Sequence, residues 1–168
     1  VIRFRHTWDL SLNWKFPELA HHGTLGLTKQ PTLYVSSQSH HSIGKAARLC
    51  GIGTVSVREI PLDGQFKMDV DALHSQIKQD SDLGFTPFFI DATAGSTNAG
   101  IVDPIAEIAD IAQEENLWLH IDAAWGGAAM FVPELLTCLN GIERADSITF
   151  DAHKWLSVPM GAGIFLTR

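Results

Sequence analysis

The sequence predicts an α/β fold in which a mostly parallel β-sheet is flanked by helices. From residue 31 onward, apolar segments of strand length alternate with amphipathic segments of helix length, which is the pattern of βαβ units. Hydrophobic residues make up 45% of the 168 residues, enough for a sizeable core within one domain. We find no internal repeat or low-complexity tract after residue 30 that would indicate a different architecture.

Six segments have the composition of strands. The segment 54–61 alternates apolar and polar residues, as a strand with one exposed face does. The segment 86–93 is mostly apolar, which is typical of a strand buried in a sheet. The expected strands are 32–37, 54–61, 86–93, 117–124, 147–153 and 161–168.

Three helices are expected between these strands, at 42–51, 69–82 and 103–116. The first ends at Gly51, a residue type that often terminates helices. The second begins at Asp69, whose carboxylate is a favourable N-cap, and carries apolar residues on one face. The start of the third is predicted by Asp103 at the N-cap and Pro104 at the first helical position.

The first thirty residues show neither a helical nor a strand period, and Pro17, Gly23 and Gly26 interrupt them further. We therefore leave residues 1–30 unassigned and expect the domain to occupy residues 31–168. Because the sequence begins with Val1 rather than Met and stops directly after a strand-like segment, we expect it to be a piece of a longer protein.

The charge and composition argue against several classes of partner. The chain has 12 Lys and Arg against 19 Asp and Glu, a net charge of −7, whereas nucleic-acid binding needs clustered basic residues. No apolar stretch reaches the roughly 18 residues of a membrane span, and no signal peptide is visible. Cys50 and Cys138 are far apart, so we expect two reduced, buried thiols in a cytoplasmic protein.

Polar and ionisable residues follow four of the expected strands, at the point where each strand ends. In an open α/β sheet the carboxyl ends of parallel strands lie at one edge, and ligands bind there. A single Asp in such a place is usually a cap or turn residue, but four strand ends together favour a site. The residues are Gln38, Ser39, His40, His41 and Ser42; Thr93, Gly95, Ser96, Thr97 and Asn98; Asp122, Ala123, Ala124 and Trp125; and Asp151, His153 and Lys154.

Lys154 and Asp122 are the residue types that pyridoxal 5′-phosphate requires. A lysine amine forms a Schiff base with the aldehyde of this cofactor, and a carboxylate keeps its ring nitrogen protonated so that the ring accepts electrons. A lysine directly after an apolar strand is otherwise costly, because its charge has to leave water. An imidazole or aromatic ring over the pyridine and hydroxyl and N–H groups at the phosphate would complete such a site.

Two other kinds of site fit the sequence less well. The adjacent pairs His21-His22 and His40-His41 would point to opposite faces of a strand, so neither pair is suited to bind one ion. Neither an H-x-x-x-H nor a C-x-x-C pattern supports a zinc site, and we expect no metal. The G-x-G-x-x-G fingerprint of a dinucleotide-binding domain is also missing after the first strand.

Four segments resemble successive motifs of the group II pyridoxal-phosphate-dependent amino acid decarboxylases. This family includes the aromatic-L-amino-acid, tyrosine, histidine, glutamate and diaminobutyrate decarboxylases. The tryptophan after the lysine and the D-A-A-W-G-G stretch favour this family over the aminotransferases and cysteine desulfurases, which share the His-Lys pair. The segments are YVSSQSHHSIGKAARLCG (34–51), PFFIDATAGSTNAGIVDPI (87–105), NLWLHIDAAWGG (116–127) and ADSITFDAHKWLSVPMGAG (145–163).

The resemblance implies three catalytic residues. Lys154 would bond to the aldehyde of the cofactor, Asp122 would pair with its ring nitrogen, and His40 would stack on the ring close to the substrate. All three would also bind the cofactor.

The resemblance implies three further cofactor-binding residues. Thr97 is expected near the ring and its hydroxyl group, Ala124 beneath the ring, and His153 at the phosphate. Asp151 stands where several members of the family carry Asn, so the resemblance does not fix its role.

The resemblance also implies part of the large domain of a fold-type-I pyridoxal-phosphate-dependent transferase-like enzyme, which decarboxylates an L-amino acid to an amine and CO2 as a homodimer. The family's Ser/Gly-rich phosphate-binding segment has no match in residues 1–33, and its catalytic loop and C-terminal small domain are not in this sequence. Two alternatives remain open: an inactive or truncated decarboxylase-like module that acts in dimerisation, and another fold-type-I enzyme, an aminotransferase or a cysteine desulfurase.

Overall fold

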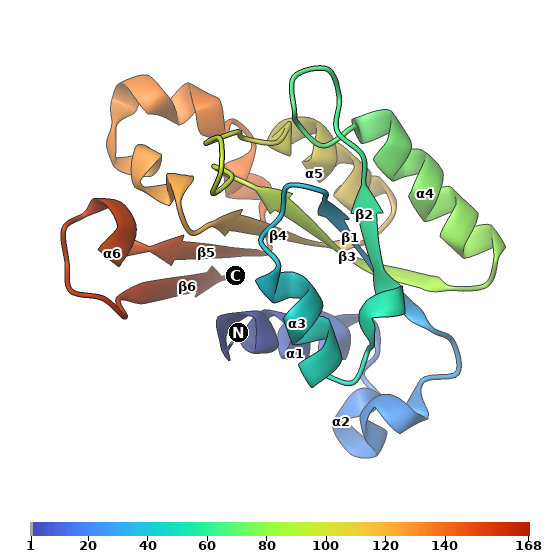
Figure 1. Cartoon of the computed structure of the whole chain (residues 1–168). Coiled ribbons are helices and arrows are strands. Elements are labelled where there is room, and N and C mark those ends of the chain that lie inside the picture. Colours follow the sequence, from blue (N-terminus) through green and yellow to red (C-terminus); the bar gives the residue numbers. More distant parts are fainter. Residues whose placement is uncertain (1) are drawn as a thin grey trace.

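A computed structural model of the chain contains one six-stranded sheet with helices on both faces, as the sequence predicts (Figure 1). The structure describes residues 2–168, with side chains at Thr7 and from Asp9 onward. The strand order is β2-β1-β3-β4-β5-β6, in which β1 to β5 pair in parallel and β6 is antiparallel to β5. The strands are β1 (Pro31–Ser36), β2 (Val57–Ile60), β3 (Thr86–Thr93), β4 (Trp118–Ala123), β5 (Ser147–Asp151) and β6 (Gly163–Thr167).

Two longer helices cover each face of the sheet (Figure 1). On one face, helices α4 and α5 pack on a core that includes Ile90 and Leu119. On the opposite face, helices α1 and α3 pack over Leu33 and Phe89. The helices are α1 (Ile2–Lys15), α2 (Leu19–His22), α3 (Ser42–Leu49), α4 (Val70–Asp82), α5 (Ile105–Glu114) and α6 (Ala152–Trp155).

The central strands have one apolar and one polar face. Successive residues of a strand point to opposite faces, so Ile90 and Ala92 enter the core beneath α4 and α5 while Asp91 faces the side of α1 and α3. All the polar residues on that second side are buried, and we call them the polar face. They are Asp91 and Thr93 on β3, His120 and Asp122 on β4, and Ser147, Thr149 and Asp151 on β5.

The predicted start of α4 is confirmed, whereas that of α5 is wrong. Asp69 is the N-cap of α4, and its carboxylate accepts a hydrogen bond from the Ala72 N–H at 2.9 Å. The N-cap of α5 is Pro104, one residue later than expected. The Asp103 carboxylate instead accepts the main-chain N–H groups of Met68 and Thr93, both at 2.8 Å, and thereby ties β3 to the segment before α4.

The N-terminal segment contains a helix that the sequence analysis left unassigned. On the described part of α1, the buried residues include Thr7 and Ser11 beside Leu12. Because two small polar residues occupy the packed side, the helix lacks the apolar period that would reveal it. Its edge also meets the sheet, where the rings of Trp14 and Trp118 pack edge to face with centroids 6.0 Å apart.

Several expected boundaries shift by a few residues. The segment expected as a strand at 54–61 begins with a short 3-10 turn, so that only Val57–Ile60 pairs with β1. The strand expected at 147–153 ends at Asp151, where α6 begins. Cys50 is half-buried and Cys138 is exposed, and neither forms a disulfide within the described part of the chain, so the expectation of two buried cysteines is wrong. None of the described helices combines the length and apolarity that a bilayer crossing requires.

The side of the sheet away from the strand carboxyl ends is held by a buried ion pair. The Arg58 guanidinium makes a forked contact with the Asp80 carboxylate, with Nε to Oδ2 at 2.9 Å and Nη2 to Oδ1 at 2.8 Å. The buried hydroxyl of Tyr34 donates to the same carboxylate at 3.0 Å. This contact joins β1 and β2 to the C-terminal half of α4.

We predict that Asp80→Asn lowers the free energy of unfolding by about 2–4 kcal/mol, because it leaves a partly buried guanidinium without its counter-charge. The matched control is Asp110→Asn, which removes the exposed ion pair with Arg144 and should cost less than about 1 kcal/mol. Denaturant unfolding of both variants measures the difference. Equal losses would contradict a stabilising role for the buried pair.

Candidate active site

Three neighbouring parallel strands place polar side chains in one row near their carboxyl ends. Thr93 on β3 is aligned with Asp122 on β4, and Asp122 is aligned with Thr149 on β5. All three belong to the polar face, so their side chains lie on the same side of the sheet. The carboxyl edge of the sheet therefore carries a carboxylate between two hydroxyl groups.

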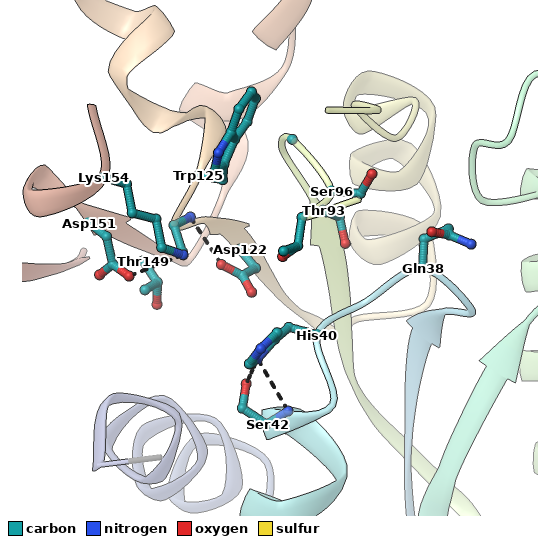
Figure 2. A pocket seen from close by; sticks show the side chains of 13 residues that line it. Gln38, His40, Ser42, Thr93, Ser96, Asp122, Trp125, Thr149, Asp151 and Lys154 are labelled. Carbon is teal, nitrogen blue, oxygen red and sulfur yellow. Dashed lines mark hydrogen bonds and ion pairs between the residues drawn. The ribbon is translucent and has the colours of Figure 1, made fainter. Parts of the chain in front are cut away.

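A hollow lies above this row, between the strand ends and the loop that leads into α3 (Figure 2). Its empty volume is about 690 Å³, a figure that includes the open mouth. The side chains of Lys154 and Asp122 point toward one another across it, and His40 lies on the opposite wall (Figure 2). The lining residues are Gln38, His40, Ser42, Thr93, Gly95, Ser96, Thr97, Asp122, Ala124, Trp125, Thr149, Asp151 and Lys154.

Asp122 forms the floor of this pocket. The residue is only 8% exposed, and its Oδ1 accepts a hydrogen bond from the Ala124 N–H at 3.0 Å. Burial raises the pKa of Asp122 above its ordinary value, while that N–H group and the neighbouring Lys154 and His40 act in the opposite direction. A cation placed against this carboxylate would favour its ionised form further.

Lys154 enters the pocket from α6, directly after β5. Its Nζ lies 3.4 Å from Asp151 Oδ2, and about a third of its side chain is exposed. The lysine charge is therefore neither buried alone nor fully hydrated, since it sits between Asp151 and the more distant Asp122. This arrangement explains how a lysine is tolerated at the end of a buried strand.

His40 lies in the loop between β1 and α3. Its Nδ1 is 2.7 Å from Ser42 Oγ, and its ring packs against that of His41 with centroids 4.1 Å apart. Burial, and then the neighbouring His41, lower the pKa of His40. The ring is thereby favoured as a neutral imidazole, which suits it for stacking on a flat aromatic group.

The structure brings five of the six expected site residues to this pocket: Lys154, Asp122, His40, Thr97 and Ala124. The sixth, His153, does not line it. Its Nδ1 lies 3.2 Å from the Ala162 carbonyl oxygen, and its Nε2 lies 3.9 Å from Asp151 Oδ2. The expected contact of His153 with a phosphate group stays a prediction.

Two residues beneath the site were missed because they lie within strands rather than at strand ends. Thr149 lines the pocket, and Asp91 lies two residues before Thr93 on the same face of β3. The signal in the sequence is polar residues at every second position of neighbouring strands, at 91 and 93, at 120 and 122, and at 147, 149 and 151. That pattern marks a polar sheet face leading up to the site.

Asp91 is fully buried, and it adds a second carboxyl group below the row. Its Oδ2 accepts from Ser39 Oγ at 3.3 Å, and that hydroxyl also lies 3.2 Å from Thr93 Oγ1. Among the residues that the structure describes, Asp91 Oδ1 has no hydrogen-bond partner. Burial, followed by the charges of Asp122 and Asp103, raises the pKa of Asp91 well above its ordinary value.

Glycines allow the loops after β3 and β4 to meet at the rim. The Gly126 N–H donates to the Ala94 carbonyl at 3.0 Å, and a Cβ on Gly126 would collide with that same oxygen. Gly95 has a positive φ of 94°, a conformation that favours glycine, and faces Gly126. This close approach places Trp125 over the pocket edge.

The donor set fits an aldehyde cofactor with a cationic heteroaromatic ring. A primary amine, a buried carboxylate with an oxygen facing the pocket, and a neutral imidazole surround one hollow. Pyridoxal 5′-phosphate needs the first two groups for its aldehyde and its ring nitrogen, and the third suits its ring face.

The family model described as "Pyridoxal-dependent decarboxylase conserved domain" matches residues 4–168. An L-aspartate decarboxylase, dtxS4, from Metarhizium robertsii is 40% identical over 143 residues, which is 85% of this chain and 28% of that protein. The aromatic-L-amino-acid decarboxylase of Bos taurus is 45% identical over 125 residues, 74% of this chain and 25% of that protein. The crystal structure of mouse CSAD in apo form superposes with a TM-score of 0.96 at 34% identity, covering 99% of this chain and 35% of that one.

The chain thus spans about a quarter to a third of the length of the proteins it matches. The match includes the N-terminal segment that the sequence analysis left unassigned.

We predict that Asp91→Asn raises the free energy of unfolding at pH 8 by about 1–3 kcal/mol, the cost of burying an unsatisfied charged group. An acid whose pKa is higher in the folded than in the unfolded protein destabilises the fold as the pH rises between the two values. The advantage of the variant should therefore shrink as the pH falls and disappear below about 4, where the unfolded wild type also binds the proton.

The control is Asp103→Asn, which should be less stable than the wild type at pH 8. Its carboxylate accepts two main-chain N–H groups, and an amide offers only one acceptor oxygen to them. Denaturant unfolding between pH 4 and pH 8 compares the two variants. An Asp91→Asn protein that is less stable than the wild type at pH 8 would show that Asp91 is buried as a compensated anion.

Proposed function

The chain belongs to the pyridoxal-dependent decarboxylase family, and from this premise we propose that its natural protein decarboxylates an L-amino acid with pyridoxal 5′-phosphate, yielding an amine and CO2. The observation that carries the proposal is the convergence of the Asp122 carboxylate and the Lys154 amine on one pocket. The names of the relatives include both an acidic and an aromatic amino acid, so we propose no particular side chain for the substrate.

When bound, the cofactor supplies an aldehyde that bonds to amines and a cationic ring that accepts the electron pair of the bond being broken. Asp122 would hold the proton on the ring nitrogen through its negative charge, and the cationic ring would keep this carboxylate ionised against the effect of burial. The Ala124 N–H fixes the orientation of this carboxylate. Asp122 thereby maintains the ring in its electron-accepting form.

Lys154 would provide the amine that bonds to the aldehyde of the cofactor. Asp151 binds this amine at 3.4 Å and keeps it at the pocket. His40 would stack on the cofactor ring, while Ser42 holds Nδ1 of His40 in place. Thr97 and Ala124, which line the pocket, would lie beside and beneath the ring. His153 would contact the phosphate of the cofactor.

The oligomeric state and the location of the natural protein are also proposed from its family. We expect a homodimer in the cytoplasm, in which residues 31–168 form part of the cofactor-binding large domain. Exposed apolar side chains in the segments that follow β4 and α6 support a covering partner or further chain, since Phe131 is 64% exposed and Met160 is 88% exposed. Sedimentation of the natural protein at micromolar concentration checks the dimer, and a monomer would contradict it.

We predict that borohydride reduction of the natural protein with pyridoxal 5′-phosphate leaves a pyridoxyl group on Lys154, found by peptide mapping. Lys154→Ala should lose this label, because no other described lysine lines the pocket where the carboxylates gather. Lys45→Ala is the matched control, since Lys45 lies on α3 near His40 and should leave the labelling of Lys154 unchanged. A label on any other lysine of the wild type would overturn the assignment.

The reaction itself is tested by its products. With a panel of L-amino acids, we expect the natural protein to release CO2 and the matching amine. Labelling of Lys154 without CO2 release would indicate an aminotransferase or a cysteine desulfurase if keto acid or sulfide formed instead. It would indicate an inactive module if no product formed.

We predict that Asp122→Asn slows CO2 release at least about 100-fold, or about 2.7 kcal/mol in the activation barrier, while the cofactor still binds. An amide has no charge with which to hold the proton on the ring nitrogen. Asp110→Asn, on the exposed side of α5, should leave the rate unchanged. A rate for Asp122→Asn within threefold of the wild type would show that this carboxylate does not serve the ring nitrogen.

A further inference from the structure

The imidazole of His40 is held along one edge by the residue at the start of α3. The Ser42 N–H donates to His40 Nδ1 at 3.4 Å, and Ser42 Oγ lies 2.7 Å from the same nitrogen. The torsion that turns a histidine ring about its Cβ–Cγ bond has broad minima, so contacts at one edge leave the ring free to tilt. A contact on the face of the ring is needed to fix its plane.

His41 supplies a contact on the face of this ring. The rings of His40 and His41 pack with their centroids 4.1 Å apart and their planes inclined by 41°. His40 lines the pocket, whereas His41 is not among the lining residues. The ring of His41 therefore lies on the side of the His40 ring that is turned away from the pocket.

The place of His41 in the chain gives its ring no other use in the described structure. His41 is the N-cap of α3, where Ser, Thr, Asp and Asn are favoured because their side chains accept an N–H group of the helix. The His41 side chain makes no such hydrogen bond, and the residue is exposed. Neither helix capping nor burial in the core therefore accounts for a histidine at this position.

We propose that His41 is a positioning residue that backs the His40 ring from outside the pocket and so holds the other face of that ring toward the cofactor. The inference rests on the proposed function, in which the cofactor ring would lie between His40 and Ala124. A side chain that is already ordered before the cofactor binds loses less conformational entropy in the complex. Such preorganisation raises the affinity without any new contact to the cofactor.

The charges around His40 agree with this packing. The titratable or charged groups near its ring are His41 before α3, Lys45 on α3, Asp122 on β4 and Lys154 on α6. Burial, followed by His41, lowers the pKa of His40, whereas Asp122 raises it. A neutral His40 ring packs against His41 without the repulsion between two imidazolium ions, and it adds no positive charge beside a cationic cofactor ring.

The affinity test removes the ring of His41 and then restores an aromatic face. His41→Ser places a favoured N-cap residue at α3, so a loss of affinity in this variant does not come from a weaker helix. We expect pyridoxal 5′-phosphate to bind the natural protein about 5-fold more weakly with His41→Ser, the effect of one aromatic pair, and within twofold of the wild type with His41→Phe. The control is His74→Ala, an exposed histidine on α4, which should bind like the wild type.

A double-mutant cycle shows whether His41 acts through His40. In a His40→Ala background, His41→Ser should change the cofactor affinity less than twofold, because the ring that His41 supports is gone. A further fivefold loss in that background would show that His41 acts independently of His40, and it would overturn the proposal. Equally weak binding by His41→Ser and His41→Phe would also overturn it, since an aromatic face would then not be the feature that matters.

The test that needs no cofactor is the contact between the two rings. In the natural protein with isotope-labelled histidine rings, we expect nuclear Overhauser effects between ring protons of His40 and His41, with the signals assigned from His40→Ala and His41→Ser. The absence of these effects would contradict the packing and overturn the proposal.

The outcomes separate this inference from the proposed function. Failure of the wild type to bind the cofactor contradicts the proposed function, while the contact between the rings still decides whether His41 backs His40. Binding by the wild type together with unchanged affinity in His41→Ser overturns the inference alone.

Discussion

The parallel register of β3, β4 and β5 is the constraint on which the site depends. It aligns Thr93, Asp122 and Thr149 in one row and brings the residues after β5, including Lys154, to the same edge. Because side chains alternate between faces, a shift of one residue in any of these strands would turn its polar residue into the core beneath α4 and α5. The apolar residues of the other face, such as Ile90 and Ile121, therefore fix the geometry of the site as much as its own residues do.

Burial shapes the charges on the polar face. It raises the pKa of Asp91 and lowers that of His120, so both groups are favoured as neutral hydrogen-bonding partners in the interior. Asp122 is also disfavoured as an anion by burial, but the Ala124 N–H and the charge of Lys154 counter this. Negative charge at the floor of the pocket is therefore concentrated on Asp122, which faces the Lys154 amine that the proposed chemistry requires.

The sequence predicts the strand ends well and the interior of the strands poorly. The convergence of Lys154 and Asp122 follows from the rule that parallel strands end at one edge, and it needs no knowledge of side-chain packing. Thr149 was missed because only the pairing register reveals that it underlies Asp122. Asp103 looked like a helix cap because its actual partner, the Met68 N–H, is remote in the sequence. The helix α1 was missed because Thr7 and Ser11 occupy its buried side.

The central claim is that one pocket at the carboxyl edge gathers the amine and the carboxylate that pyridoxal 5′-phosphate needs. A crystal structure of the natural protein with this cofactor tests it most directly. The account predicts continuous density between the cofactor and Lys154 Nζ, with the ring nitrogen about 2.7–3.2 Å from a carboxylate oxygen of Asp122. A cofactor joined to another lysine, or a ring nitrogen facing a residue other than Asp122, would contradict it.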